Sequence, residues 1–307
     1  MSRRRFTSSS EPRLCVAGLV YFEIFLPEGD LDIPLDREVF VDAIDVGLGG
    51  ALNPSSVAAS LGIDTTLAHP RGHGLTDAAV AARIDRLEVD TRCWATDDDP
   101  ALSLVRSESG DRGFLSRADY DALRDCPGLI DFDWIHVPGL EEAHRLDGPL
   151  NEARRAGATI SVAGSWAPAR LDELTNHQTR PWDVLILNAA EARRALGQPD
   201  GHAQSLIAEF RDVRPTVLIT DGPRAVYAAV DGEILCVEPP PADHFVDATG
   251  AGDAFGAGFI SARLHNCSPV DAIEFGARVA STVVGLHGGV VYDSNRFKDL
   301  SDFDLSN

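Results

Sequence analysis

Lysine is almost absent from this chain. Lys298 is the only lysine among 27 basic side chains, and the other 26 (27 − 1) are arginines. A phosphate-binding loop of the Walker type needs Gly-Lys-Ser or Gly-Lys-Thr, whereas Lys298 is followed by Asp299. Protein-kinase chemistry needs a lysine on a strand, and Schiff-base chemistry needs a buried one. These enzyme classes are excluded, so any phosphate chemistry must use backbone N–H groups, arginines and metal ions.

Positive charge is scarce as a whole. The 27 basic residues face 48 acidic ones, which gives a net charge of −21. A nucleic-acid partner is excluded, because phosphate contacts need patches of Lys and Arg. The one basic cluster, Arg3 to Arg5, lies in a Ser-rich stretch (1–12) that we expect to be a disordered leader. The acidic excess fits a GC-rich genome, which favours Arg over Lys, and equally fits adaptation to high salt.

Long apolar runs and paired cysteines are also missing. No run approaches the roughly 20 residues of a membrane span, and no apolar segment follows Arg3 to Arg5. We therefore expect a cytoplasmic protein without membrane contact.

The five cysteines are far apart and form no C-x-x-C pair, so we expect reduced, mostly buried thiols rather than disulfides or a zinc site.

What the chain does contain is an ordinary globular pattern. Its 307 residues are 44% hydrophobic, enough for a sizeable core. Short apolar runs alternate with amphipathic segments, which predicts an α/β fold with a mostly parallel sheet and ligands beyond the carboxyl ends of its strands. Strands are predicted at 14–17, 65–68, 134–137, 159–162, 184–187 and 216–220, and helices at 54–61, 75–87, 149–156, 189–196, 203–210, 252–264 and 270–286.

Two stretches interrupt the alternation. The segments 25–45 and 92–116 are predicted to form a small β lid over the sheet edge, and surface excursions without function are the alternative. The segments 13–24, 46–91 and 117–307 then form the α/β core.

The stretch 245–255 carries the most chemistry. It reads Phe-Val-Asp-Ala-Thr-Gly-Ala-Gly-Asp-Ala-Phe, with Gly250 and Gly252 just before a helical pattern. A glycine turn entering a helix offers free N–H groups and the positive end of the helix dipole, which together bind an anion. Asp253 at the mouth of such a site is well placed to take a proton from an attacking hydroxyl. The alternative is a helix-capping Asp after a glycine turn.

Residues 247–255 closely resemble the C-terminal signature of the ribokinase-like (PfkB) carbohydrate and nucleoside kinases. The resemblance implies that Gly250, Ala251 and Gly252 form the anion hole for the transferred phosphoryl group and that Asp253 is the catalytic base. It spans roughly 14–290 and implies a Rossmann-type three-layer α/β/α core with a small β-sheet lid.

Two further motifs follow on the nucleotide side. Asn188-Ala-Ala-Glu191 is similar to the family's Asn-x-x-Glu motif. The resemblance implies that Glu191 organises the Mg²⁺ shell and that Asn188 approaches the nucleotide phosphates. The alternative is that both residues only cap the helix that follows the strand. The turn from Thr220 through Gly222 resembles the Thr-x-Gly-x-x-Gly motif beside the nucleotide, with Ala225 in place of the last glycine.

The acceptor side matches less closely. Gly49-Gly50-Ala-Leu-Asn53 resembles the family's N-terminal Gly-Gly motif that touches the sugar, but aligning Asn53 places Leu48 at the first glycine position. Glu23 stands where the family usually has an Asp that grips sugar hydroxyls.

The resemblance also implies a potassium site. Asp247 and Thr249, with the loop 285–289, match the place where many relatives bind K⁺. His287 in that loop is expected in the wall of the nucleotide pocket.

These patterns predict a sugar kinase that uses ATP and Mg²⁺ on a small-molecule sugar or sugar derivative. A nucleoside kinase is the first alternative and predicts an aromatic clamp from Phe22, Phe114 or Trp166. A catalytically silent sugar-binding protein is the second. The family resemblance further implies a homodimer formed through the lid.

Overall fold

The computed structural model describes residues 11–27, 35–87, 89–108, 111–174, 180, 182–211 and 213–300. The predicted leader (1–12) lies outside the described residues except for its last two positions.

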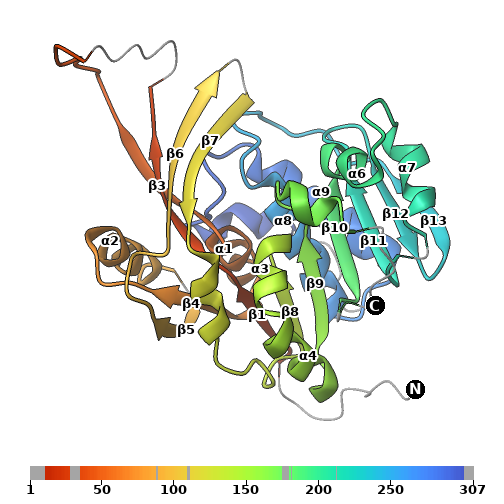
Figure 1. The fold of residues 1–307 in the computed structure, drawn as a ribbon. Coiled ribbons are helices and arrows are strands. Elements are labelled where there is room, and N and C mark those ends of the chain that lie inside the picture. The colour runs from red at the N-terminus through yellow and green to blue at the C-terminus, as the bar shows by residue number, and fades with distance from the viewer. Residues whose placement is uncertain are drawn as a thin grey trace.

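The core is built on one nine-stranded sheet with the order β13-β12-β11-β10-β9-β8-β1-β4-β5 (Figure 1). All neighbours from β11 to β5 run parallel, and β12 and β13 extend the sheet as an antiparallel hairpin. The central strands are short apolar runs because helices cover both of their faces. The strands are β1 Arg13–Ala17, β4 Asp64–Arg71, β5 Asp90–Ala95, β8 Trp134–Val137, β9 Thr159–Ala163, β10 Val184–Asn188, β11 Thr216–Thr220, β12 Val226–Val230 and β13 Glu233–Val237.

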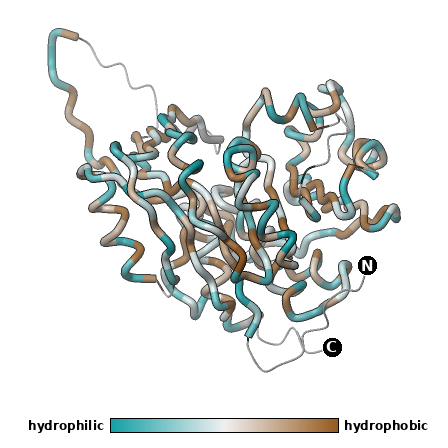
Figure 2. Tube along the Cα trace, turned by 60° about the horizontal axis from the view of Figure 1, so that its bottom comes forward, coloured by the Kyte–Doolittle hydropathy of each residue, from teal (hydrophilic) through white to brown (hydrophobic). Residues whose placement is uncertain are grey.

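Helices form a layer on each face of this sheet. Two separate hydrophobic clusters, one on each face, confirm the predicted three-layer arrangement. One layer holds α1 Leu52–Ser60, α2 Leu75–Ile84, α8 Ala251–Leu264, α9 Pro269–Val283 and the 3₁₀ helix η2 Ser294–Leu300. The other holds η1 Tyr120–Asp125, α3 Leu140–Arg145, α4 Asp147–Ala156, α5 Pro168–Leu171, α6 Ala189–Leu196 and α7 Ala203–Glu209. Hydrophilic and hydrophobic residues alternate along the outer helices of the tube (Figure 2).

The helices α8 and α9 pack closely because small residues face each other. A Cβ on Gly258 would lie 2.9 Å from the Cα of Gly276, and a Cβ on Gly276 would lie 2.7 Å from the carbonyl oxygen of Phe255. Glycine at both positions lets the two helix backbones approach each other closely.

A second, four-stranded sheet with the order β3-β2-β6-β7 projects from the core (Figure 1). Its strands are β2 Val20–Phe25, β3 Asp45–Gly50, β6 Ala101–Glu108 and β7 Asp111–Ala118. The predicted boundaries 25–45 and 92–116 differ from these. Pairing of β2 with β3 begins at Val20 and Gly50, so the lid starts directly at the core. Residues 92–95 pair with β4 as part of β5, which makes them the edge of the main sheet.

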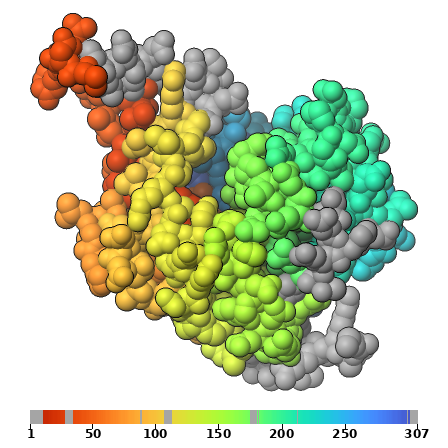
Figure 3. All heavy atoms as spheres, in the orientation of Figure 1, coloured from red at the N-terminus to blue at the C-terminus, as the bar shows by residue number. Residues whose placement is uncertain are grey.

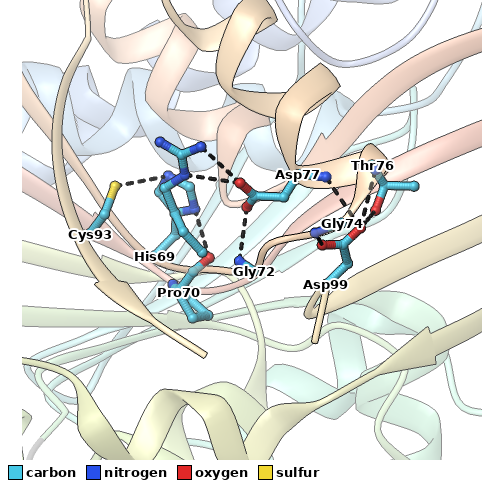
Figure 4. Close-up of polar contacts among 9 residues, drawn as sticks. His69, Pro70, Gly72, Gly74, Thr76, Asp77, Cys93 and Asp99 are labelled. Carbon is cyan, nitrogen blue, oxygen red and sulfur yellow. Dashed lines mark hydrogen bonds and ion pairs between the residues drawn. The ribbon is translucent and has the colours of Figure 1, made fainter. Parts of the chain in front are cut away.

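Asp99 ties the entrance of the lid to the core (Figure 4). Its carboxylate accepts hydrogen bonds from the N–H groups of Gly74 at 2.6 Å and Thr76 at 3.1 Å, and from the Thr76 hydroxyl. It therefore caps the first turn of α2 from the segment that leads into β6. On the same turn, Asp77 is buried and pairs with Arg71 at 2.8 Å.

The cysteines are all unpaired in the described part of the chain. Cys15 and Cys267 are buried, whereas Cys93 and Cys236 are exposed, so the expectation of mostly buried thiols is wrong. Cys93 and Cys236 lie on the two edge strands of the sheet, where no further strand of the described residues covers them. Within the described ranges, no helix is long and apolar enough to cross a membrane.

Candidate active site

Asp253 lies in the first turn of α8 Ala251–Leu264. Gly250 precedes the helix with φ = 76°, a left-handed conformation that favours glycine, and no side chain caps this end. The N–H of Ala251 donates to the carbonyl of Ala248 at 3.2 Å. A Cβ on Gly252 would meet no atom within 4 Å, so the backbone there faces open space. The arrangement fits an anion approaching the helix N-terminus.

Three separate segments meet at this turn. A Cβ on Gly250 would lie 2.4 Å from the Cα of Gly289, in the loop after α9. Gly289 in turn packs against the amide of Asn53, since a Cβ added to Gly289 would lie 2.7 Å from Asn53 Cγ. The Asn53 Nδ2 donates to Asp253 Oδ2 at 2.9 Å. The contacts hold the Asp253 carboxylate in a fixed position.

The surroundings of Asp253 make it a better base than an ordinary carboxylate. Burial raises the pKa of Asp253 to about 6, and the hydrogen bond from Asn53 opposes this rise. A carboxylate with this pKa is mostly ionised at neutral pH and still binds a proton more tightly than a solvated Asp.

Glu191 is held at the start of α6 by a reciprocal cap. Its carboxylate accepts the Asn188 N–H at 2.8 Å, and the Asn188 side chain accepts the Glu191 N–H at 2.9 Å. Glu191 is buried, and a Cβ on Gly164 would lie 2.2 Å from its Oε2. Burial, and then the Asp253 charge, raise the pKa of Glu191 to about 7. The capping alternative is thus observed, and the role of both residues toward a nucleotide stays a prediction.

A third carboxylate, Glu142 on α3, was not predicted from the sequence. It is 5% exposed and accepts the N–H of Leu19 at 2.7 Å. A Cβ on Gly18 or on Gly139 would lie within 3 Å of its oxygens, at 2.8 Å and 2.4 Å. Burial, and to a lesser degree the Asp253 charge, raise the pKa of Glu142 to about 7.

The three carboxylates share the carboxyl edge of the sheet. Glycines follow β1, β8 and β9 there, and side chains at those positions would displace Glu142 or Glu191. Because the Asp253 charge raises the pKa of both glutamates, all three belong to one electrostatically coupled group. The surface is hollowed between the yellow lid strands and the green helices, and blue atoms of the C-terminal third lie at the back of the hollow (Figure 3).

On the predicted nucleotide side, Thr220 and Asn188 end neighbouring strands and are paired in register. Gly222 has φ = 56° in the turn that follows, which explains the glycine at this position. The turn closes through the Asp221 N–H, which donates to the Ala225 carbonyl at 2.9 Å. The structure therefore brings the Asn-x-x-Glu and Thr-x-Gly motifs together.

His287 is exposed in the loop after α9. The neighbouring Asp247 is buried, and its carboxylate accepts the N–H groups of Thr249 and Gly288, both at 2.9 Å. Asp247 thus joins the turn before α8 to the loop 285–289. The K⁺ site assigned to these residues stays a prediction.

On the predicted acceptor side, the diglycine has a defined steric reason. A Cβ on Gly49 would lie 2.2 Å from Glu23 Oε1, so the buried Glu23 carboxylate lies directly against this backbone. Gly50 has φ = 68° and leads into α1. Leu48 is buried in the core, so the diglycine follows a core residue and Asn53 still reaches Asp253.

Mg²⁺ needs few protein ligands when phosphates supply the others. In the described part of the chain no group of three His, Cys, Asp or Glu side chains forms a dedicated metal cage. Glu191 and Asp253 are buried carboxylates, and burial raises the pKa of both, so as oxygen donors they fit a hydrated ion brought in with phosphates.

Comparisons with known proteins agree with this geometry. The model of the pfkB family carbohydrate kinases matches residues 141–294. The 1-phosphofructokinase of Haloferax volcanii is 41% identical over 276 residues, 85% of each chain. The 2-dehydro-3-deoxygluconokinase of Dickeya dadantii is 38% identical over 202 residues, which are 61% of this chain and 64% of the relative.

Solved structures show the same fold. The ribokinase of Cryptococcus neoformans, solved in complex with ADP, has a TM-score of 0.75 at 18% identity, covering 95% of this chain and 100% of that one. The expected ribokinase-like three-layer fold with a smaller sheet is confirmed. The family match over half of the chain, and a relative 41% identical over 85% of it, show that this chain belongs to the pfkB family of carbohydrate kinases.

Proposed function

We propose that this protein transfers the γ-phosphoryl group of ATP to a hydroxyl of a sugar or sugar derivative. The observation that carries the proposal is the position of Asp253, a desolvated carboxylate in the first turn of an uncapped helix and fixed by Asn53. A base that adjoins an anion-binding turn suits transfer of a phosphoryl group to a hydroxyl.

Each residue then has one task. Asp253 accepts the proton of the attacking hydroxyl, and the backbone of Gly250, Ala251 and Gly252 holds the phosphoryl oxygens. The strand-end residues Asn188 and Thr220 line the nucleotide, together with Gly222 and His287. Mg²⁺ near Glu191 neutralises phosphate charge when bound with ATP.

Glu23, Asn53 and the Gly49-Gly50 backbone face the acceptor in this proposal. Carboxylates accept hydrogen bonds from hydroxyl groups, so Glu23 fits a polyhydroxy substrate. The names of the relatives, a 1-phosphofructokinase and 2-dehydro-3-deoxygluconokinases, also favour sugar derivatives over nucleosides.

The nucleoside alternative needs an aromatic clamp. Phe22 packs against the core, while Phe114 and Trp166 are 55% and 63% exposed. Only the last two are available to cover a base, and nothing else in the described site favours this alternative.

The test is phosphoryl transfer from ATP and Mg²⁺ to a panel of pentoses, hexoses, sugar acids, phosphorylated sugars and nucleosides. Asp253→Asn should lower turnover by roughly 10²–10⁴ with little change in nucleotide affinity. Asp200→Asn, which removes an exposed carboxylate away from the site, is the matched control and should leave turnover unchanged. Turnover of Asp253→Asn near that of the wild type would remove Asp253 as the base. Nucleotide binding without turnover on any acceptor would favour the silent sugar-binding protein.

The proposal includes a cytoplasmic homodimer joined through the lid. Large apolar side chains on the lid and its connecting segment are exposed, among them Phe40 at 84%, Leu115 at 72% and Ile44 at 59%. Figure 2 shows hydrophobic residues along this projecting segment. Light scattering coupled to size exclusion should give twice the chain mass, and Phe40→Ser should shift it toward the monomer.

A further inference from the structure

Ser165, which follows β9, has an unusual backbone conformation. Its φ is 49°, in the left-handed region that favours glycine. Two other non-glycine residues of the described chain share this region, and each has an ordinary reason. Asp231 precedes Gly232 in the hairpin turn between β12 and β13, and Asn266 follows the C-terminal end of α8. Ser165 lies in neither kind of turn, and serine adopts this conformation less readily than Asp or Asn.

The Ser165 side chain has no partner inside the protein. Its hydroxyl makes no hydrogen bond within the described ranges, and the residue is exposed at the carboxyl edge of the sheet. A left-handed residue other than glycine costs free energy, and such residues cluster at functional sites. The contacts of the folded chain do not explain why a side chain stands where glycine would be unstrained.

Two of the buried carboxylates flank Ser165. A Cβ added to Gly139 would lie 3.5 Å from Ser165 Cβ and 2.4 Å from Glu142 Oε2, so Ser165 adjoins Glu142. On the other side, the preceding residue Gly164 lies against Glu191, because a Cβ there would be 2.2 Å from Glu191 Oε2. The serine hydroxyl therefore stands between the two glutamates.

The strand order places Ser165 between the two substrates of the proposed reaction. In the sheet, β9 lies between β10 and β8. β10 ends at Asn188 on the predicted nucleotide side, and β8 adjoins β1, after which the chain continues into β2 and Glu23 on the predicted acceptor side. The transferred phosphoryl group passes between these two sides.

The same position lies close to the proposed base. Burial, and then the Asp253 charge, raise the pKa of both Glu142 and Glu191, so Asp253 is near the two glutamates that flank Ser165. An ionised carboxylate only accepts hydrogen bonds and repels a phosphate, whereas a serine hydroxyl donates one. Ser165 is thus the neighbour that suits a phosphoryl oxygen.

We propose that the Ser165 hydroxyl donates a hydrogen bond to an oxygen of the γ-phosphoryl group of ATP. The inference rests on the proposed function, which supplies ATP as the phosphoryl donor. Ser165 follows β9 and leads to the helical layer opposite α8, so the phosphoryl group is then held from two sides. Contact with the bound phosphoryl group also gives the strained serine a reason that the free protein lacks.

The experiment compares two nucleotides that differ by the γ-phosphoryl group. A non-hydrolysable ATP analogue and ADP, each with Mg²⁺, are titrated by calorimetry into the full chain of the wild type, Ser165→Ala and Ser165→Gly. Ser165→Ala removes only the hydroxyl, and Ser165→Gly removes it together with the backbone strain. Asn266→Gly is the matched control, because it relaxes another left-handed residue at the far end of α8.

We expect both Ser165 variants to bind the ATP analogue about tenfold more weakly, as for loss of a hydrogen bond to a charged group, and to bind ADP like the wild type. Ser165→Gly should keep or raise the melting temperature, so its weaker binding does not come from unfolding. Asn266→Gly should bind both nucleotides like the wild type.

Unchanged affinity of both Ser165 variants for the analogue, or an equal loss of affinity for the analogue and for ADP, would overturn the proposal. A failure of the proposed function looks different. Wild-type protein that binds the analogue but phosphorylates no acceptor would contradict transfer to a sugar, and the same titrations would still decide the Ser165 contact.

Discussion

Replacing Glu142 with glutamine should stabilise the protein without ligands at alkaline pH. Burial raises the pKa of Glu142 from 4.5 to about 7, so its ionised form is disfavoured in the folded state. A difference of 2.5 pH units between folded and unfolded states corresponds to about 3 kcal/mol. Glutamine has the same shape, carries no charge and still accepts the Leu19 N–H through its carbonyl oxygen.

The sign of the pH dependence follows from the direction of the shift. A carboxyl group whose folded pKa is raised contributes stability below its unfolded pKa and loses it as pH rises through the folded pKa. The advantage of Glu142→Gln should therefore be about 3 kcal/mol at pH 8 and shrink to about 1 kcal/mol at pH 5. Solvent entering the hollow beside the site would reduce the first value.

Urea denaturation of wild type and Glu142→Gln at pH 5 and pH 8 measures both differences. Glu152→Gln, at an exposed position of α4, is the matched control and should stay within about 0.5 kcal/mol of the wild type. A stability difference that does not change with pH, or a destabilised variant at pH 8, would refute the assignment of Glu142 as a desolvated charge.

Four further outcomes are expected. Activity should fall as pH drops through about 6, the pKa of Asp253. Asn53→Ala should move this acidic limb of the pH–activity profile to higher pH, because it removes the hydrogen bond that lowers the pKa of Asp253. An acidic limb at the same pH in the variant would show that another group than Asp253 causes it. Gly164→Ala places a Cβ 2.2 Å from Glu191 Oε2. It should lower the free energy of unfolding, measured by chemical denaturation, by about 1–3 kcal/mol and remove most of the turnover. Gly148→Ala is the control, because its Cβ meets open space and the change should be tolerated. Turnover should be several-fold higher in KCl than in NaCl of equal concentration, and equal rates would argue against the K⁺ site. If the acidity is an adaptation to salt, the melting temperature should rise steeply toward molar KCl, while a flat response favours genomic bias.

The parallel core was predictable because its strands are buried on both faces. The strands at 134–137 and 216–220 have the predicted bounds. Continuous apolar runs of this kind have few other structures available in a chain of this length. The edge strands β5 and β13 were missed, since strands exposed on one side mix polar and apolar residues, and β12 was missed together with the hairpin that it forms with β13.

The site was predictable where one short segment carries the chemistry. Asp253 and Glu191 belong to local motifs in which a few neighbouring residues set the geometry. Glu142 has no such signal, because its environment arises from glycines that follow two different strands.

The hairpin of α8 and α9 has a consequence for which changes in length the protein tolerates. The two helices have 14 and 15 residues, so the chain travels about 21 Å away from Gly250 and about 22 Å back toward Gly289. Deleting one residue inside either helix would shift its end by about 1.5 Å and rotate it by about 100°. Gly250 and Gly289 would then lose their contact, and Asn53 its neighbour. An extra residue in the turn at 265–268, at the far end of both helices, would leave that contact intact, so natural length variation should collect there and avoid the helices.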